Sequence, residues 1–192
     1  KSINQILLNR DLPLITLDTY MSLFTFPVKS FYEKLGLDFK IHSFSKIGDE
    51  FIEFYNINFK ILKLHNNTFK MLNKIKSIGL TQSILSAAMQ EMLEEWIMDH
   101  KITDFFVKIS GVDNQYAHGK IALGNQHIND LSFDRNEILM IGDTGHDSEV
   151  AEQMKIDCIL VDHGHVCRTR LKKTGRKIFS NFMEIFKYLI RD

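Results

Sequence analysis

The stretch that decides the fold is Ile138-Leu139-Met140-Ile141-Gly142-Asp143-Thr144-Gly145-His146-Asp147. In it an apolar run ends abruptly at a glycine and an aspartate, and a second aspartate follows four residues after the first. This pattern predicts a buried strand that ends at the carboxyl edge of a parallel sheet, where open α/β folds bind their ligands. Gly142 allows a sharp turn. Thr144 can then start a helix that brings Asp147 within one turn of Asp143.

Two carboxylates at such a turn have two interpretations. Their oxygen atoms suit a hard cation such as Mg²⁺, which would make Asp143 and Asp147 metal ligands. The same pattern is also produced by a simple strand–turn–helix junction, because aspartate is a common helix cap. Taken alone, this segment favours neither interpretation.

The rest of the chain changes character near residue 64. Before that point, apolar residues recur at helical spacing, which predicts a small layer of helices in residues 1–64. After it, predicted strands alternate with predicted helices; the strands are expected at 82–86, 105–109, 137–141, 158–161 and 178–179. Such alternation implies right-handed crossovers. We therefore predict an α/β protein whose residues 65–192 form a Rossmann-like parallel sheet with helices on both faces.

Composition narrows the class of protein. At 192 residues the chain can bury a full core. Its formal net charge is zero, which argues against a nucleic-acid or membrane partner. No apolar run approaches the length of a membrane span, and no secretory signal opens the sequence. The two cysteines, Cys158 and Cys167, lack metal-ligand spacing, so a reducing cytoplasm is the simplest compartment.

Two further residues follow the predicted strands. Ser86 comes after the apolar pair Ile84-Leu85, and Ala87-Ala88 is expected to open a helix; a hydroxyl and free N–H groups at a helix start bind phosphate well. An ordinary serine cap explains the same residues. Lys120 is expected to begin a helix and could neutralise a phosphate dianion, although most lysines are simply exposed.

The row Asp162-His163-Gly164-His165 follows the predicted strand that ends at Val161. Two histidines and an aspartate suggest zinc, but structural zinc usually needs four ligands and catalytic zinc three. The sequence has no HExxH or CxxC motif to complete such a site. A loop beside a phosphate site fits this row better.

Taken together, these residues are far more specific than they are separately. Ser86, Lys120 and the pair Asp143/Asp147 occur in this order at successive strand ends. This order resembles motifs two, three and four of the haloacid dehalogenase (HAD) superfamily of phosphohydrolases. The phosphoglycolate-phosphatase-like branch is the most similar, through residues 82–88, 120–124, 141–144 and 161–165 and the helical Phe26-Pro27-Val28. The resemblance covers essentially the whole chain.

The resemblance implies a Mg²⁺-dependent phosphatase that acts on a small phosphomonoester through an aspartyl-phosphate. Asp143 would bind Mg²⁺ directly. Asp147 would be a second ligand, or would hold a Mg²⁺-bound water and Lys120. Ser86 and the Ala87 N–H would hold the phosphoryl oxygens, and Lys120 would balance their charge.

The resemblance also implies a division of the chain. Residues 1–64 would form a helical cap domain, which in such enzymes excludes water and chooses the substrate. Residues 65–192 would form the HAD-like core domain.

One departure from the family is important. Its first motif is a strand that ends in Asp-x-Asp and supplies the nucleophile, and this sequence contains no Asp-x-Asp. The nearest candidate is residues 14–20, with either Asp18 as nucleophile and Tyr20 in the acid position, or Thr16 in the nucleophile position and Asp18 as acid. The segment resembles cap sequence more closely. In that case the chain starts inside the first helix of the cap, and the nucleophile is absent from it.

This departure has a structural and a functional consequence. In the superfamily the first strand lies in the middle of the sheet, so without it the strands at Ile84 and Ile138 would each expose an unpaired apolar edge. We expect the strand to belong to a segment outside this chain, and we expect the chain alone to be inactive on phosphomonoesters. The alternative is a non-catalytic relative that binds a phosphorylated ligand or a partner chain.

Overall fold

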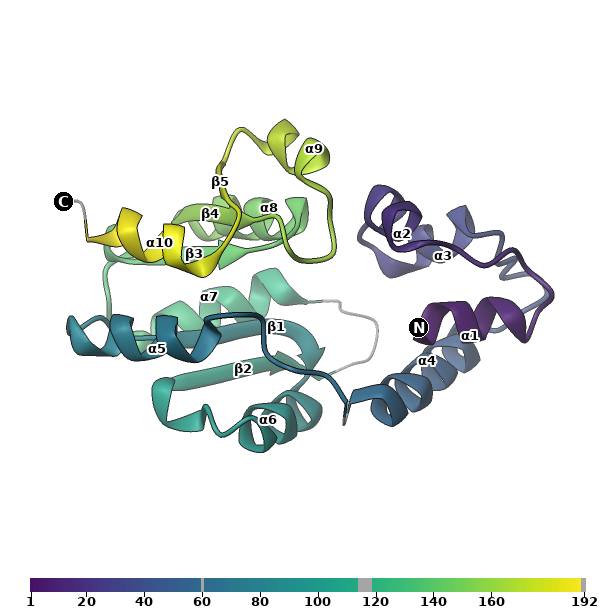
Figure 1. Ribbon diagram of the computed structural model, residues 1–192, viewed down its shortest axis with the longest axis horizontal. Coiled ribbons are helices and arrows are strands. Elements are labelled where there is room, and N and C mark those ends of the chain that lie inside the picture. Colours follow the sequence, from purple (N-terminus) through teal and green to yellow (C-terminus); the bar gives the residue numbers. More distant parts are fainter. Residues whose placement is uncertain (60, 114–118, 191–192) are drawn as a thin grey trace. The chain divides into compact units, whose positions relative to one another are not determined.

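A computed structural model describes residues 1–59, 61–113 and 119–190 (Figure 1). The chain divides into two compact units, Lys1–Lys63 and Leu64–Asp192, which we call unit 1 and unit 2. None of the helices within the described residues is long and apolar enough to cross a membrane.

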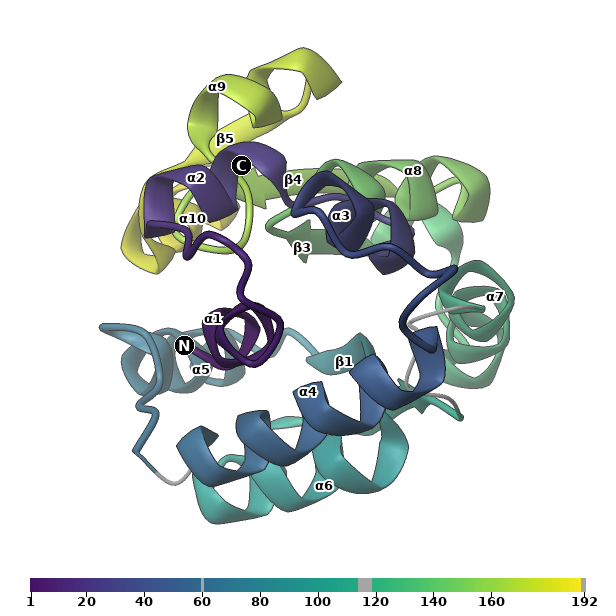
Figure 2. The same ribbon diagram turned by 90° about the vertical axis from the view of Figure 1, so that its right-hand side faces the viewer.

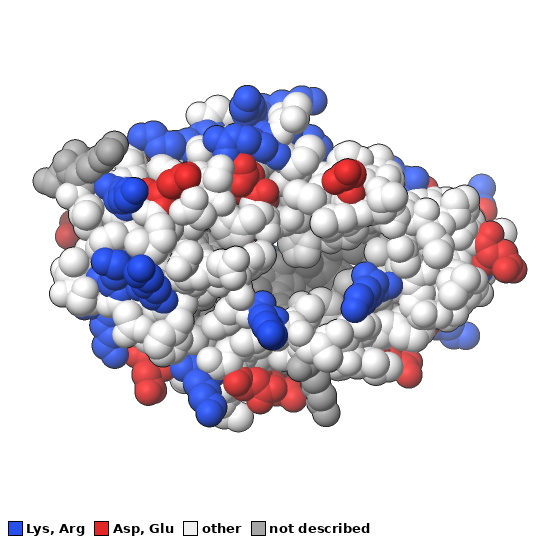
Figure 3. Space-filling model, viewed as in Figure 1, with Lys and Arg blue, Asp and Glu red and all other residues white. Residues whose placement is uncertain are grey.

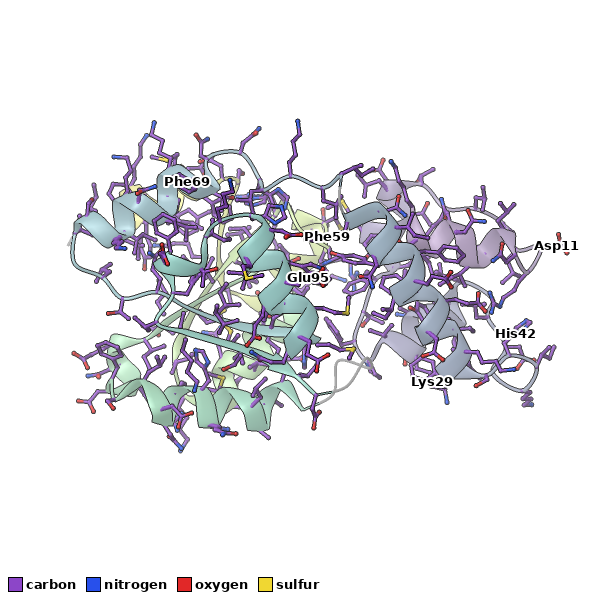
Figure 4. All side chains as sticks on the ribbon, turned by 90° about the horizontal axis from the view of Figure 1, so that it is seen from below. Asp11, Lys29, His42, Phe59, Phe69 and Glu95 are labelled. Atoms are coloured by element: carbon purple, nitrogen blue, oxygen red, sulfur yellow. The ribbon has the colours of Figure 1, made fainter. Side chains whose placement is uncertain are left out.

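The regular secondary structure of unit 1 is helical within the described residues (Figure 2). Its helices are α1 (Ser2–Leu8), α2 (Leu17–Leu23), α3 (Val28–Lys34) and α4 (Phe44–Phe59). Helix α1 packs against α4, and the side chains of Ile6, Leu7, Phe31 and Ile47 are almost completely buried in this unit. Asp11, after α1, has a left-handed backbone with a φ of 54°, and its side chain points away from the helices (Figure 4).

The segment around Asp18 does not form a strand. Asp18 lies in the first turn of α2, and the Thr16 hydroxyl caps this helix by accepting a hydrogen bond from the Thr19 amide at 3.1 Å. Neither of the two strand registers considered for residues 14–20 is therefore formed. The threonine cap favours the helix because it satisfies one of the amides left unpaired at a helix start.

Unit 2 has the alternating α/β order that the sequence predicted. Its strands are β1 (Ser83–Met89), β2 (Lys108–Val112), β3 (Leu139–Gly142), β4 (Asp157–Val161) and β5 (Lys177–Phe179). Its α-helices are α5 (Thr68–Ser77), α6 (Gln90–Asp99), α7 (Lys120–Leu131), α8 (Gly145–Met154), α9 (Arg168–Leu171) and α10 (Phe182–Leu189). Short 3₁₀ turns occupy Thr103–Phe105, Arg135–Glu137 and Lys172–Thr174. Every strand pairing among the described residues is parallel, which confirms the predicted fold class.

The strands form two sheets rather than one. Within the described residues the strand orders are β1-β2 and β3-β4-β5, so β1 and β3 are both edge strands. Figure 1 shows them as the inner edges of the two sheets. This arrangement confirms the expected unpaired edges at Ile84 and Ile138.

Helices hold the two sheets in one unit. On α5, Leu72 packs in the cluster of β1 and β2, whereas Met71 and Ile75 pack against β4 and α10. On α7, Gly124 lies against both β1 and α8: a Cβ added there would come within 2.5 Å of the Met154 sulfur. The side-chain layers therefore span the break between β1 and β3.

Burial differs between the strands of unit 2. Four of the five residues of β4 are buried, whereas no residue of β1 or β3 is buried. Ile141 in β3 is 39% exposed although helices follow and precede its strand. Within the described part of the chain, no strand is paired with the inner edge of β1 or of β3.

Candidate active site

A buried ion pair joins the two sheets. The Lys120 Nζ lies 2.5 Å from Asp147 Oδ1, and both side chains are only 9% exposed. Lys120 begins α7, which follows β2, and Asp147 lies in the first turn of α8, which follows β3. The pair therefore joins the first turns of the helices that follow β2 and β3.

The electrostatics of Asp147 keep it charged. Burial alone would raise the pKa of this carboxyl group, but the Lys120 ammonium and the hydrogen bonds from Lys120 and Thr144 outweigh it and lower the pKa. A buried carboxylate of this kind is stable only with its partners in place. Asp147 and Lys120 thus form one interdependent unit.

Both oxygens of Asp147 are already engaged. Besides the bond from Lys120 to Oδ1, Oδ2 accepts hydrogen bonds from the Thr144 amide at 3.0 Å, the Thr144 hydroxyl at 2.7 Å and the Asp143 amide at 3.2 Å. The Thr144 hydroxyl also accepts from the Asp147 amide, which completes a reciprocal helix cap. A carboxylate offers about four acceptor positions, so Asp147 has little capacity left for a metal ion.

Gly142 makes room for this arrangement. A Cβ at position 142 would lie 2.3 Å from Asp147 Cβ, a separation that real atoms do not adopt. The glycine at the end of β3 is therefore required by the approach of Asp147, whereas its φ is not in the left-handed region and does not itself require glycine.

Asp143 differs from Asp147 in the hydrogen bonds that its carboxylate oxygens accept. Its Oδ2 accepts a hydrogen bond from the His165 amide at 2.7 Å. Its Oδ1 has no hydrogen-bond partner within the described residues. One hard, negatively charged oxygen is thus available at the carboxyl end of β3, and it is of the type that Mg²⁺ prefers.

The carboxylates of Asp143 and Asp147 could bind Mg²⁺ only together with other ligands. Residues 1–59, 61–113 and 119–190 contain no group of three or more His, Cys, Asp or Glu side chains placed to hold a metal ion. Mg²⁺ tolerates this situation, because it usually keeps several waters and binds through one or two carboxylates together with substrate phosphate.

The predicted helix start at Ser86 is wrong. Ser86 and Ala87 lie inside β1, and α6 begins only at Gln90. The Ser86 hydroxyl accepts a hydrogen bond from the Ala88 amide at 3.1 Å, so it supports a local irregularity of the strand. No hydrogen bond among the described residues joins Ser86 or Ala87 to Lys120, Asp143 or Asp147.

The strand continues past Ser86 because β2 provides partners for it. Met89 pairs with Val112, and the Gln90 side chain then bonds to the β2 backbone, donating to the Ile109 carbonyl at 3.3 Å and accepting from the Gly111 amide at 2.5 Å. Gly111 permits this contact, since a Cβ there would lie 2.7 Å from the Ala88 carbonyl oxygen. Glycine inside a strand often marks such a close approach, and this signal in Ile109-Ser110-Gly111-Val112 was available in the sequence.

A histidine pair beside Asp143 was not predicted. The rings of His65 and His163 meet edge to face with centroids 4.6 Å apart, and His163 meets Phe182 at 4.9 Å. Burial is the largest cause that lowers the pKa of His65, and the neighbouring His163 and His165 lower it further while Asp143 opposes them. His65 lies just before α5, far from His163 in sequence, and no local pattern indicates the pairing.

The basic segment after β4 lies outside this group. Lys and Arg side chains gather over α9 and the turn that follows it (Figure 3). Arg168 pairs with Asp162 at 2.5 Å, and Arg176 donates to the Ser148 hydroxyl at 2.8 Å. Arg168 also bonds to Ser180 and to the Ile178 carbonyl, so it joins the segments before and after α9.

The carboxyl ends of the strands define one edge of unit 2. In Figure 1 the ends of β1 and β2 and the beginnings of α7 and α8 lie at the same edge. Lys120, Asp143 and Asp147 are joined there by hydrogen bonds. An ammonium group, a charged carboxylate that orients it and a second carboxylate with an available oxygen can together bind a phosphate group and a divalent cation.

Comparison with known proteins gives a match to a family model. The family model described as haloacid dehalogenase-like hydrolase matches residues 1–161. No curated protein matches the chain.

Several solved structures share the fold. A predicted phosphatase from Clostridium acetobutylicum is 19% identical, with a TM-score of 0.78 over 100% of this chain and 89% of that chain. A predicted phosphoglycolate phosphatase from Haemophilus somnus is 17% identical, with a TM-score of 0.74 over 98% and 88%. Protein Tyrosine Kinase A from Mycobacterium tuberculosis is 16% identical, with a TM-score of 0.81 over 98% and 88%. At these identities the likeness concerns the fold.

Proposed function

The chain belongs to the family of haloacid dehalogenase-like hydrolases, and we propose on that basis that it carries most of the active site of a Mg²⁺-dependent phosphatase for a small phosphomonoester. The observation that carries the proposal is the buried pair of Lys120 and Asp147 hydrogen-bonded to the backbone of Asp143. A buried ion pair contributes little net stability, because the desolvation of both charges offsets their attraction, and this favours a role for the Lys120 charge in binding.

Lys120 has the central role in binding the phosphoryl group. An ammonium group has three N–H donors, and one of them is directed at Asp147. The others can donate to phosphoryl oxygens and balance their negative charge. Asp147 keeps Lys120 charged and fixes its direction, because both oxygens of Asp147 are occupied within the protein.

Asp143 would hold the cation through Oδ1. When bound, Mg²⁺ would neutralise charge on the phosphoryl group, which is most of what phosphoryl transfer requires. Ser86 and the Ala87 amide stay candidates for holding the phosphoryl oxygens. The interruption of β1 pairing after Leu85 supports this role, because it changes the regular strand at these residues.

The nucleophile is proposed to be an aspartate on a strand that lies between β1 and β3. The two unpaired inner edges support this placement, since a strand there would join both sheets into one. A carboxylate oxygen would bond to phosphorus while the bond from phosphorus to the substrate oxygen breaks, and an acid would protonate the leaving oxygen. Water would then cleave the aspartyl-phosphate and release inorganic phosphate.

The helical unit 1 is proposed to act as the cap that chooses the substrate. In hydrolases of this kind a mobile cover excludes water and commits the substrate. We place the enzyme in the cytoplasm, where Cys158 and Cys167, which are both free thiols, would stay reduced.

Addition of the proposed strand tests the proposal. The chain would be compared with a version extended by an apolar strand that ends in Asp-x-Asp, using p-nitrophenyl phosphate and Mg²⁺. We expect turnover only from the extended protein, and loss of that turnover when the first added aspartate becomes asparagine. Turnover by the unextended chain that disappears in Asp18→Asn would instead make Asp18 the nucleophile.

A second function has one observation in its favour. The sequence contains no Asp-x-Asp to supply a nucleophile. This is what we would expect of a protein that binds a phosphorylated ligand or a partner chain without catalysis. In that case the extended protein would bind inorganic phosphate through Lys120 but would hydrolyse nothing.

A further inference from the structure

The loop that follows β4 contacts Asp143 and also packs against two aromatic rings from other segments. His165 donates its amide to Asp143 Oδ2 at 2.7 Å. The His163 ring lies between the rings of His65 and Phe182, with centroid distances of 4.6 and 4.9 Å. The loop is thus fixed by ring packing on one residue and by a charge-assisted hydrogen bond two residues later.

Gly164 lies between these two contacts and touches Asp143. A Cβ at position 164 would lie 2.0 Å from Asp143 Oδ2 and 2.4 Å from Asp143 Cγ. No side chain larger than a hydrogen atom fits there while the loop and the carboxylate keep their places. The absence of a side chain is therefore a requirement of the contact.

This contact divides the two oxygens of Asp143. Oδ2 is covered by Gly164 and bonded to the His165 amide. Oδ1 has no hydrogen-bond partner in the part of the chain that the structure describes. A carboxylate whose one oxygen is fixed presents the other in a single direction.

From this geometry we infer that the Gly164–His165 turn is a positioning element, which fixes Asp143 so that Oδ1 alone is presented to a divalent cation. His163, clamped between His65 and Phe182, keeps the turn in place. The identity of the cation as Mg²⁺ rests on the proposed function, whereas the restraint on Asp143 does not.

The test compares Gly164→Ala with Gly145→Ala in the full chain. Gly145 lies in the neighbouring turn and is a matched control, because a Cβ there would meet only Thr174 Cγ2, at 3.8 Å. Two-dimensional NMR would follow the His165 amide, through its chemical shift and its hydrogen-exchange rate, and its response to added Mg²⁺. NMR detects weak binding, so the experiment does not require an active enzyme.

We expect Gly164→Ala to accelerate exchange of the His165 amide to the rate seen in Asp143→Ala, and to weaken Mg²⁺ binding about 10- to 100-fold, the usual effect of removing a group that orients a ligand. Gly145→Ala should leave both quantities unchanged. An unchanged His165 amide and unchanged Mg²⁺ affinity in Gly164→Ala would overturn the inference.

Two further outcomes are informative. If Gly164→Ala does not fold, His163→Leu replaces it, because this variant removes the ring contacts without adding bulk at Asp143. His163→Leu should show the same changes in smaller degree. No change in His163→Leu would refute the role of the turn. If the wild-type chain and its strand-extended form both fail to bind Mg²⁺, the proposed function is contradicted. The restraint on Asp143 is still decided by comparing the His165 amide in wild type, Gly164→Ala and Asp143→Ala.

Discussion

At the scale of single residues, the site depends on what each carboxylate oxygen is already doing. Asp143 and Asp147 have the same chemistry and lie one helical turn apart, so the sequence predicted both as possible metal ligands. The hydrogen bonds distinguish them: Asp147 is occupied by Lys120 and Thr144, whereas Asp143 keeps one oxygen available. Spacing alone could not give this difference, because it depends on the directions of side chains from α7 and on the loop after β4.

This difference predicts a ranking of Mg²⁺ affinities. Asp143→Asn keeps the shape of the side chain but removes the charge of the proposed ligand, so it should weaken binding severely. Asp147→Asn should weaken binding less, because Asp147 acts through Lys120 and the turn. Calorimetric titration of Mg²⁺ into both variants of the strand-extended protein measures this, and an equal or greater loss in Asp147→Asn would reverse the assigned roles.

The buried ion pair makes a second prediction about single residues. Lys120→Met would leave the Asp147 carboxylate buried without its cation, which costs about 3–5 kcal/mol in comparable cases. The double variant Lys120→Met/Asp147→Asn removes the uncompensated charge and should recover much of that loss. Urea unfolding of the two single variants and the double variant forms the test. Additive losses would mean that the pair does not act as a unit.

At the scale of elements, the helices and strands were easier to predict than their ends. The strand expected at 105–109 is displaced to Lys108–Val112, because Thr103–Phe105 forms a 3₁₀ turn and Phe105 and Phe106 pack against the cluster around Leu93. Similarly, β1 runs past Ser86 because β2 supplies partners as far as Val112. Apolar runs show that a strand exists, whereas its last residue is set by pairing with a distant segment.

Helix α7 carries a buried histidine that links stability to pH. His127 Nδ1 lies 2.7 Å from the Ser110 hydroxyl and Nε2 lies 2.9 Å from the Ser83 hydroxyl, so this side chain ties α7 to both β1 and β2. Burial, the largest cause, and Lys108 lower the pKa of His127 below its ordinary value of 6.5, while Asp130 raises it. The folded protein therefore favours the neutral ring.

The sign of the pH effect follows from this shift. The unfolded chain binds a proton at His127 more readily than the folded chain, so the stabilisation is complete above pH 6.5 and is lost as the pH falls through the folded pKa. Urea unfolding at pH 7.5, 6.5 and about 5.5 should show this loss in the wild type, and His127→Gln should reduce it. His65→Gln serves as a comparison, since the pKa of His65 is also lowered. Identical pH dependence in wild type and His127→Gln would contradict the prediction.

At the scale of the whole molecule, the parallel α/β core was predictable from periodicity. The unpaired edges of the strands now seen as β1 and β3 were expected only through the resemblance to a family. Periodicity gives the order of strands and helices, but it does not show which strands pair with one another. Among the described residues, the inner edges of β1 and β3 are unpaired and Ile141 is 39% exposed. Unpaired apolar edges are prone to associate with other chains.

The free edges predict how the chain behaves in solution. The unextended chain should associate increasingly as its concentration rises, and should melt at a lower temperature than the strand-extended protein. Light scattering over a concentration series and thermal unfolding of both proteins measure these quantities. Equal melting temperatures and equal scattering would show that no strand occupies the position between β1 and β3.

The central claim is that Lys120, Asp143 and Asp147 form the working part of a phosphatase site, and steady-state turnover of p-nitrophenyl phosphate tests it most directly. The strand-extended protein, its Lys120→Met and Asp143→Asn variants and the Gly145→Ala control would be measured with Mg²⁺. We predict turnover in the parent and the control, and a loss of about 100-fold or more in the other two, as expected when a charge that stabilises the transition state is removed. Full turnover in Lys120→Met or Asp143→Asn, with folding intact, would contradict the account.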